Sequence, residues 1–213
     1  MIIKIIRFVF FAVLVRFIVL IIIGLNVRRK QLLPQSGPAI IVANHNSHLD
    51  TMVLMSLFPL RLISKLRPVA AADYFTKNKF LNFFSKRIIG IIPVSRSGED
   101  RDPLVPIEDA LADDSIIIFF PEGTRGEPGL LQKFKSGIAR LAKRQPQVPV
   151  YPIFLHGLGR AMPKGTALLV PFFCDVWVDE KMHYAHEDYR AYLVELDGRF
   201  QALADNIQIP AWD

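Results

Sequence analysis

The chain has 213 residues, of which 51% are hydrophobic, and this composition excludes a disordered or low-complexity protein. Its net charge of +6 resides in residues 1–33, which hold six basic side chains and no acidic one, whereas the remainder holds 20 of each sign. The apolar context of these charges favours a membrane surface over nucleic acid as the partner. The single cysteine, Cys174, rules out an internal disulfide and is consistent with a reducing, cytoplasmic compartment.

Residues 8–25 form a candidate membrane segment, since sixteen of these eighteen residues are apolar. As a helix they would be about 27 Å long, close to one hydrocarbon thickness. Arg16 near the middle makes insertion costly, so a re-entrant or interfacial helix competes with a full span. A cleaved signal peptide is disfavoured because no small-residue cleavage site follows. The basic run 28–30 favours a retained anchor at the inner membrane, with the rest of the chain on its cytoplasmic side.

Beyond this segment, apolar β-type runs alternate with helical patterns. Strands that are apolar on both faces and separated by helices indicate one α/β layered domain, with a mixed, mostly buried central sheet flanked by helices. We therefore expect an anchor over 1–30, a linker over 31–38 and a single domain over 39–213. The expected strands are 39–43, 69–72, 91–94, 115–120, 148–155 and 168–178, and the expected helices are 48–58, 80–89, 104–113, 136–144 and 187–204.

The first group of residues that could carry chemistry is Asn44-His45-Asn46-Ser47-His48-Leu49-Asp50, where a buried strand ends and a helix begins. Ser47 is the expected N-cap, with Asp50 in the first helical turn. On one continuous helix His45 and Asp50 would lie about 140° apart and would not meet. His45 must therefore lie in a loop folded back over the helix start. There the Asp50 carboxylate can orient the imidazole and leave its other ring nitrogen free as a general base.

Two other interpretations of this group stay open on spacing alone. The same side chains could simply cap the helix. His45, His48 and Asp50 also approach the ligand pattern of dinuclear zinc hydrolases, but Thr51 stands where that pattern needs a histidine, and the other histidines form no recognisable ligand set. We therefore expect no metal and no bound cofactor.

A second group follows the apolar run 116–120 and reads Pro121-Glu122-Gly123-Thr124-Arg125-Gly126. Pro121 stops strand pairing and Gly123 allows a turn, so the acid and the arginine should stand at the carboxyl end of the strand, where open α/β sheets bind ligands. Arginine is suited to bidentate phosphate recognition. A solvated turn with a local Glu–Arg pair is the simpler alternative.

Two weaker signals accompany these groups. Residues 90–96 form an apolar strand that ends in Arg96, and residues 133–137 form a basic, glycine-bearing helix entry. Each by itself is more typical of ordinary surface charge than of a site. There is no Gly-x-Ser-x-Gly sequence, and Cys174 sits among apolar residues with no sign of activation. The sequence therefore offers a candidate base but no candidate nucleophile.

In order and approximate spacing, these segments resemble the four motifs of the glycerolipid acyltransferases, and the chain looks like a bacterial-type 1-acylglycerol-3-phosphate acyltransferase. The resemblance extends from about residue 39 to residue 175. The first and third motifs, His-x4-Asp and Phe-Pro-Glu-Gly-Thr-Arg, are highly specific together, and the other two are supportive. The matching segments are Asn44–Asp50, Gly90–Arg96, Phe120–Arg125 and Val148–Ile153.

The resemblance implies an enzyme that moves a fatty acyl group from an acyl thioester, either acyl-carrier protein or acyl-CoA, to the free hydroxyl of 1-acylglycerol 3-phosphate. The product would be phosphatidic acid, for phospholipid synthesis. His45 would be the general base and Asp50 its orienting partner, and no acyl-enzyme would form, so the missing nucleophile is expected. The resemblance implies substrate binding by Arg96, Glu122, Gly123, Thr124, Arg125, Lys133 and Lys135, and an acyl-site or structural role for Pro149, Val150 and Pro152.

Two alternatives to this function stay open. The same reaction could act on another lysolipid, such as a lyso-ornithine lipid that carries no phosphate. A non-catalytic membrane lipid-binding protein could also keep this fold. The His45 and Asp50 pair argues against the second alternative, because a scaffold needs no base and no group to orient it.

Overall fold

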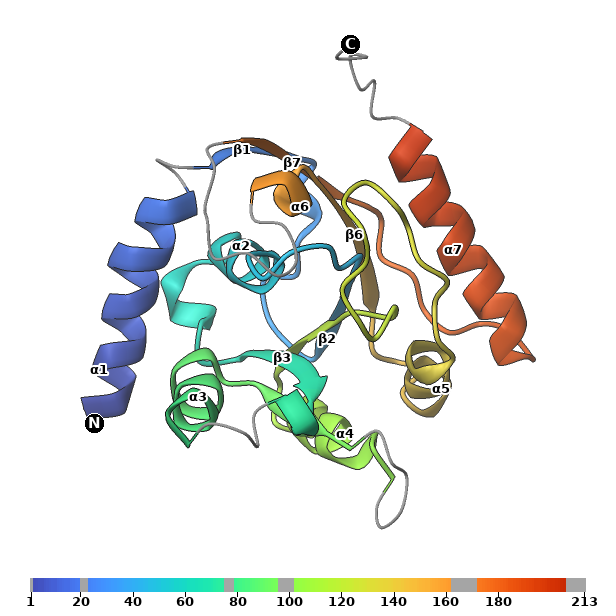
Figure 1. The fold of residues 1–213 in the computed structure, drawn as a ribbon. Helices are drawn as coiled ribbons and strands as arrows, with labels where there is room; N and C mark the ends of the chain where they lie inside the picture. The colour runs from blue at the N-terminus through green and yellow to red at the C-terminus, as the bar shows by residue number, and fades with distance from the viewer. Residues whose placement is uncertain (1, 20–22, 75–78, 96–101, 162–171, 206–213) are drawn as a thin grey trace.

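The computed structural model describes residues 2–19, 23–74, 79–95, 102–161 and 172–205. These residues build a seven-stranded sheet with the strand order β1-β7-β6-β2-β5-β3-β4 (Figure 1). Five neighbouring strands from β6 to β4 run parallel, β7 is antiparallel to β6, and β1 is parallel to β7. The strands are β1 (Gly24–Arg28), β2 (Ala39–Ala43), β3 (Leu66–Ala71), β4 (Ile92–Val94), β5 (Ile116–Phe119), β6 (Val150–His156) and β7 (Phe173–Val178).

Helices cover both faces of this sheet, because its central strands are apolar on both sides (Figure 1). Along β2 the residues alternate: Ala39, Ile41 and Ala43 pack with α2, α6 and the N-terminal helix, while Ile40 and Val42 pack with α4, α5 and α7. The α-helices are α1 (Ile2–Val9), α2 (Asp50–Ser56), α3 (Lys79–Phe84), α4 (Val105–Ala112), α5 (Gly137–Arg144), α6 (Leu158–Ala161) and α7 (Tyr189–Asp205).

Every strand and helix expected after residue 38 is present, with ends that shift by a few residues. The expected helix over 80–89 is α3 followed by a π-helical turn, Ser85–Ile89. The expected strand over 168–178 begins at Phe173 as β7, and its first residues lie outside the described part of the chain. A mixed, mostly buried sheet flanked by helices is therefore confirmed.

The structure does not support a single apolar helix over residues 8–25, one of the forms expected for the candidate membrane segment. α1 continues as a π-helix over Phe10–Val15, and no helix among the described residues is both long and apolar enough to cross a bilayer. Gly24 and Leu25 already belong to β1, which pairs with β7. β1 is therefore an edge strand of the main sheet, although it precedes the expected linker over 31–38.

Arg7 explains how the N-terminal helix is held against the rest of the protein. Its guanidinium donates hydrogen bonds to the carbonyl oxygens of Ile63, Leu66 and Ile89. Burial, together with the nearby charge of Arg67, lowers the pKa of Arg7 to about 10, so it stays charged at neutral pH. One turn and two turns further along, Phe11 and Val15 on the same helix face are at most 3% exposed.

Candidate active site

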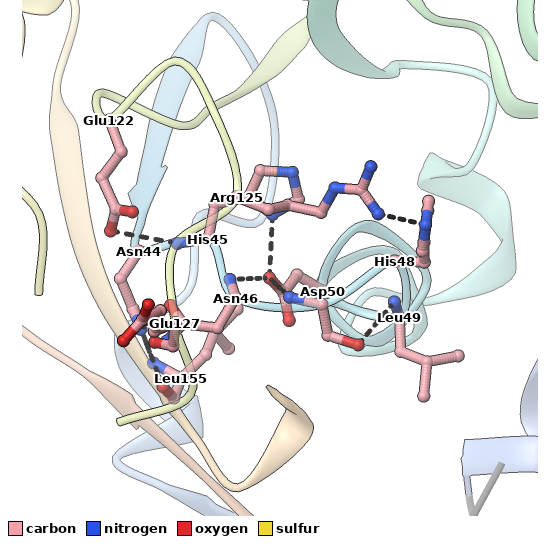
Figure 2. Close-up of polar contacts among 11 residues, drawn as sticks. Asn44, His45, Asn46, His48, Leu49, Asp50, Glu122, Arg125, Glu127 and Leu155 are labelled. Atoms are coloured by element: carbon pink, nitrogen blue, oxygen red, sulfur yellow. Dashed lines mark hydrogen bonds and ion pairs between the residues drawn. The ribbon is translucent and has the colours of Figure 1, made fainter. Parts of the chain in front are cut away.

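Sheet topology brings the two specific sequence motifs together. β2 lies beside β5 in parallel register, so the loops that follow their carboxyl ends meet at one edge of the sheet. His45 lies in the loop after β2, and the loop after β5 carries Glu122 and Arg125 (Figure 2). The amide of Gly126 donates to the carbonyl oxygen of His45 at 2.8 Å, which joins the two loops directly.

His45 and Asp50 form a hydrogen-bonded pair, as the sequence predicts. The Nδ1 atom of His45 lies 2.8 Å from Oδ2 of Asp50, and the two side chains are 20% and 1% exposed (Figure 2). The same Oδ2 atom accepts hydrogen bonds from the backbone amides of Asn46 and Ser47, at 2.7 and 2.8 Å. These hydrogen bonds fold the loop back over the start of α2. The fold brings the imidazole of His45 to the Asp50 carboxylate, although the two residues are five positions apart.

The capping role expected for Ser47 is wrong in detail. α2 begins at Asp50, and the residue that precedes it is Leu49. The hydroxyl of Ser47 instead accepts a hydrogen bond from the Leu49 amide at 3.3 Å, within the loop. Asp50 takes over the organising role, because its carboxylate reaches back to amides that precede the helix.

Asn44 is a site residue that the sequence analysis did not single out. Its side-chain amide is 3% exposed and pairs with both backbone groups of Leu155 on β6, donating at 2.8 Å and accepting at 2.7 Å. It therefore extends the pairing of β2 and β6 by one step and fixes the base of the His45 loop. An asparagine placed directly after an entirely apolar strand is the sequence signal that points to such a buried, paired amide.

Glu122 is buried beside the backbone of His45. The residue is 1% exposed, and its Oε1 atom accepts a hydrogen bond from the backbone amide of His45 at 3.2 Å (Figure 2). Burial raises the pKa of Glu122 to about 7, and the charge of Asp50 adds to that rise, while the backbone amides of His45 and Gln132 oppose it. Glu122 thus acts on the position of the base.

Replacing Glu122 with Gln should change how stability depends on pH. The folded protein holds the Glu122 proton more tightly than the unfolded chain, so the native protein loses stability as the pH rises from 4.5 toward 7. Because glutamine stays neutral and still accepts from the backbone amide of His45, Glu122→Gln should gain on the order of 2 kcal/mol over the native protein between about pH 5 and pH 8. Urea unfolding at several pH values measures this difference.

Asp109→Asn is the matched control, because Asp109 is an exposed carboxylate on α4. Its stability difference from the native protein should stay level over the same pH range. A level difference for Glu122→Gln as well would contradict the buried, proton-holding role assigned to Glu122.

Arg125 contacts His48, so the two motif loops also meet through side chains. An Nη1 atom of Arg125 hydrogen bonds to Nε2 of His48, which precedes α2 (Figure 2). Gly123, earlier in the same loop, has a φ of +71°, a conformation that disfavours other residues, and Thr124 is exposed. The tight turn at Gly123 therefore lets the chain place Glu122 inside and Arg125 outside.

The remaining predicted binding residues are placed as follows. Arg96 lies outside the described residues. Lys133 and Lys135 are exposed, and the backbone amide of Lys135 donates to the carbonyl of Pro121 at 2.9 Å, next to the motif turn. Pro149, Val150 and Pro152 belong to the pairing of β6 with β2, in which Val150 and Pro152 lie opposite Ile40 and Val42 and the Pro149 carbonyl accepts from the Ile40 amide.

This geometry supplies a base and an adjacent cation. When Nδ1–H of His45 donates its hydrogen bond to the Asp50 carboxylate, the neutral ring keeps Nε2 free to accept a proton. The ring stacks on Phe120 at a centroid separation of 4.1 Å. Cys174, buried on β7, has a pKa raised to about 12 by burial, which disqualifies it as a thiolate nucleophile. Within the described part of the chain, no group of three His, Cys, Asp or Glu side chains could hold a metal ion.

Comparison with known proteins shows the family to which the chain belongs. Residues 24–156 match the sequence model of the family described as Acyltransferase, which is more than half of the chain. The chain belongs to this acyltransferase family. The matched region includes β1 and ends with β6, so it contains both loops of the candidate site.

Several 1-acyl-sn-glycerol-3-phosphate acyltransferases are similar to this chain. It is 32% identical over 150 residues to the chloroplastic 1-acyl-sn-glycerol-3-phosphate acyltransferase LPAT1 of Arabidopsis thaliana, covering 67% of this chain and 38% of that protein. It is 30% identical over 135 residues to the human 1-acyl-sn-glycerol-3-phosphate acyltransferase alpha, covering 62% and 46%. The chain thus aligns with less than half the length of these relatives.

The fold of the acyltransferase family is also recognisable in three dimensions. The crystal structure of the 1-acyl-sn-glycerophosphate (LPA) acyltransferase PlsC from Thermotoga maritima superposes with a TM-score of 0.78 and covers 99% of this chain and 81% of that one. The sequence identity is 18%, so this likeness shows a shared fold.

Proposed function

We propose that the protein transfers a fatty acyl group from an acyl thioester to the free hydroxyl of 1-acylglycerol 3-phosphate. The observation that carries this proposal is the pair formed by His45 and Asp50, at 2.8 Å, beside the loop that bears Arg125. The named activities of the relatives support the same choice of acceptor. Acyl-carrier protein and acyl-CoA share the thioester that this reaction needs.

The reaction proceeds by direct transfer. The hydroxyl of the acceptor gives its proton to Nε2 of His45 while its oxygen attacks the thioester carbonyl carbon. The hydrogen bond to Asp50 holds the imidazole in the tautomer that can accept this proton, and the carboxylate stabilises the imidazolium that forms. Collapse of the tetrahedral intermediate breaks the carbon–sulfur bond, and the departing thiolate takes the proton to become the free thiol.

Arg125 gives this site its preference for a phosphorylated acceptor. A guanidinium binds phosphate oxygens through two parallel hydrogen bonds, which the hydroxyl of a neutral lipid cannot reproduce. Glu122 does not contact the phosphate, because its carboxylate is buried behind His45. Two residues of the loop after β5 therefore have different roles: Glu122 positions the base and Arg125 binds the acceptor.

A panel of lysolipids tests the acceptor. The purified full chain is supplied with acyl-CoA or acyl-carrier protein and with 1-acylglycerol 3-phosphate, lysophosphatidylcholine, or a lyso-ornithine lipid. The phosphate monoester should give the highest kcat/KM with at least one of the donors. Preference for the phosphate-free lipid would contradict the proposed acceptor while leaving acyl transfer intact.

We also propose that the protein binds the surface of an anionic membrane through the N-terminal helix and α3. The outer side of the N-terminal helix exposes apolar side chains, with Ile2 at 70%, Val13 at 63% and Phe17 at 56%. Phe80 and Phe83 of α3 are also exposed, and α3 lies beside this helix because Phe84 meets Phe10 at a centroid separation of 5.2 Å (Figure 1). Exposed apolar area on this scale marks an interaction surface.

Basic side chains border this apolar surface, as binding to anionic lipid requires. Lys86 and Arg87 follow α3 and are exposed. Each basic side chain near an anionic bilayer contributes about 1 kcal/mol of attraction. The N-terminal helix would lie in the plane of the interface, with Arg7, Phe11 and Val15 turned toward the protein.

The double variant Phe80→Ser/Phe83→Ser should weaken binding to vesicles of phosphatidylglycerol and phosphatidylcholine by more than about tenfold, since each buried Phe contributes about 1.5–3 kcal/mol. Flotation with the vesicles measures the bound fraction. Val194→Ser is the matched control, because Val194 is 73% exposed on α7, a helix of the opposite sheet face. Equal binding by all three proteins would contradict a membrane contact through α3.

A further inference from the structure

His48 is a histidine to which neither the catalytic pair nor the fold assigns a task. It lies three residues after His45, in the turn before α2, and its ring is largely exposed. An exposed histidine with no partner would have no structural role. Its Nε2 atom is instead hydrogen bonded to Nη1 of Arg125, which comes from the loop after β5 (Figure 2).

The chemistry of this contact fixes the protonation of His48. A guanidinium carries only N–H donors, so the Nε2 atom of His48 must accept and cannot hold a proton. The ring is therefore neutral, with its hydrogen on Nδ1. A protonated ring would instead present a second N–H and a second positive charge to Arg125.

We propose that neutral His48 is a positioning residue that holds the Arg125 guanidinium at the mouth of the site, and that protonation of His48 releases it and weakens acceptor binding. The proposal rests on the proposed function for the identity of the acceptor. His48 would thus help to bind the acceptor, although it is not one of the residues that define either of the two specific motifs. His48 itself need not touch the phosphate, because it acts through Arg125.

The charges that surround His48 agree with this role. Partial burial lowers the pKa of His48, and the charge of Arg125 and then that of His45 lower it further, while Asp50 opposes them. These groups come from the His48 loop itself, from the start of α2 and from the loop after β5. His48 is therefore neutral at pH 7, and it gains its proton at a lower pH than an ordinary histidine does.

Two substitutions at His48 test the proposal kinetically. His48→Ala removes the acceptor atom, so KM for 1-acylglycerol 3-phosphate should rise about tenfold, the usual scale for losing a hydrogen bond to a charged group. His48→Gln keeps an oxygen acceptor that cannot titrate, so it should stay within about threefold of the native KM. The KM for the thioester donor should stay within about twofold of the native value in both variants, because the substitutions change only the position of the Arg125 guanidinium that binds the acceptor.

The pH profile separates positioning from mere packing. The phosphate of the acceptor also titrates, with a second pKa near about 6, so the native profile by itself is not diagnostic. The ratio of native KM to the KM of His48→Gln cancels that shared contribution. This ratio should rise as the pH falls from 7.5 to about 5, as His48 takes up its proton. A ratio that stays level, a His48→Gln as impaired as His48→Ala, or a loss confined to kcat would each overturn the proposal.

A readout without turnover keeps this inference separate from the proposed function. In ¹⁵N NMR spectra of the full chain, Nε2 of His48 should be unprotonated at pH 7, with the signal assigned from the spectrum of His48→Gln. Replacing Arg125 with Gln should raise the titration midpoint of His48, because a cation has been removed from its side. An unchanged midpoint would overturn the pairing even if the acyl transfer is observed, and a raised midpoint would support it even if the acceptor proves to be another lipid.

Discussion

His45→Ala should abolish thioester-dependent acylation of 1-acylglycerol 3-phosphate, with kcat reduced by about 1,000-fold or more, because the base that accepts the hydroxyl proton is lost. Without that base the attacking hydroxyl must lose its proton to water, and no other group among the described residues is paired with a carboxylate at this opening. Release of free thiol, followed in a steady-state assay with saturating acceptor and donor, measures the loss. The KM values should change little, since Arg125 and the acyl side of the site are untouched.

His183→Ala is the control for a histidine that does no chemistry, because His183 is exposed in the segment before α7. Urea unfolding of the His45→Ala protein should show a loss of about 1–3 kcal/mol, the scale of one hydrogen bond to a carboxylate, so the protein stays folded. Turnover by folded His45→Ala at a rate near that of His183→Ala would exclude His45 as the base.

Asp50→Asn should reduce kcat by about 100-fold to 10,000-fold, as for carboxylates that orient a catalytic histidine elsewhere. The carboxylate accepts hydrogen bonds from His45, Asn46 and Ser47 at a single oxygen. An asparagine can direct its oxygen to the two backbone amides or to the imidazole, and where its NH₂ group faces Nδ1 the histidine proton must move to Nε2. A ring protonated on Nε2 cannot take the hydroxyl proton, so the base is present but in the wrong tautomer.

The matched control for this substitution is Asp113→Asn, since Asp113 is an exposed carboxylate at the end of α4. Steady-state kinetics should show native kcat for the control. Asp50→Asn should have two effects, which urea unfolding separates. Weaker hydrogen bonds to the buried amides of Asn46 and Ser47 should lower the free energy of unfolding by about 1–3 kcal/mol. The wrong tautomer of His45 should lower kcat without lowering stability. A folded Asp50→Asn with kcat within a few-fold of the native enzyme would contradict the orienting role.

The catalytic pair could be predicted from sequence because its geometry is local. His45 and Asp50 are five residues apart, and only a loop folded back over a helix start allows them to meet, which is how the structure joins them at 2.8 Å. The central strands could also be predicted from sequence, since β2 and β5 are short, continuous apolar runs bounded by polar turns. Neither feature depends on knowing which strands are neighbours.

The partners of Glu122 and Arg125 could not be predicted, because they depend on the order of strands in the sheet. Only when β2 and β5 are adjacent does Glu122 meet the amide of His45 and does Arg125 meet His48. A carboxylate in a glycine-bounded turn also looks exposed in sequence, whereas Glu122 is 1% exposed. This burial favours a positioning role for Glu122, while its part in substrate binding stays a prediction.

The packing of the N-terminal region could not be predicted, because apolar composition does not distinguish a lipid-facing helix from one packed on a protein. Phe11 and Val15 face the domain core, while Val13 and Phe17 face outward. Arg7 lies before the apolar run, and three carbonyl groups of the domain bind its guanidinium. The strand Gly24–Arg28 was hidden at the end of the apolar run, since its place in the sheet requires β7, which lies far along the chain.

Acyl transfer to a phosphorylated lysolipid, with His45 as the base, is tested most directly by the ratio of two products in one reaction. Purified protein is incubated with acyl thioester and 1-acylglycerol 3-phosphate, and mass spectrometry quantifies both the free thiol and the diacyl phosphatidic acid. The mechanism predicts equal amounts of the two, formed only when His45 is present. Release of thiol without phosphatidic acid, or equal phosphatidic acid from His45→Ala, would contradict it.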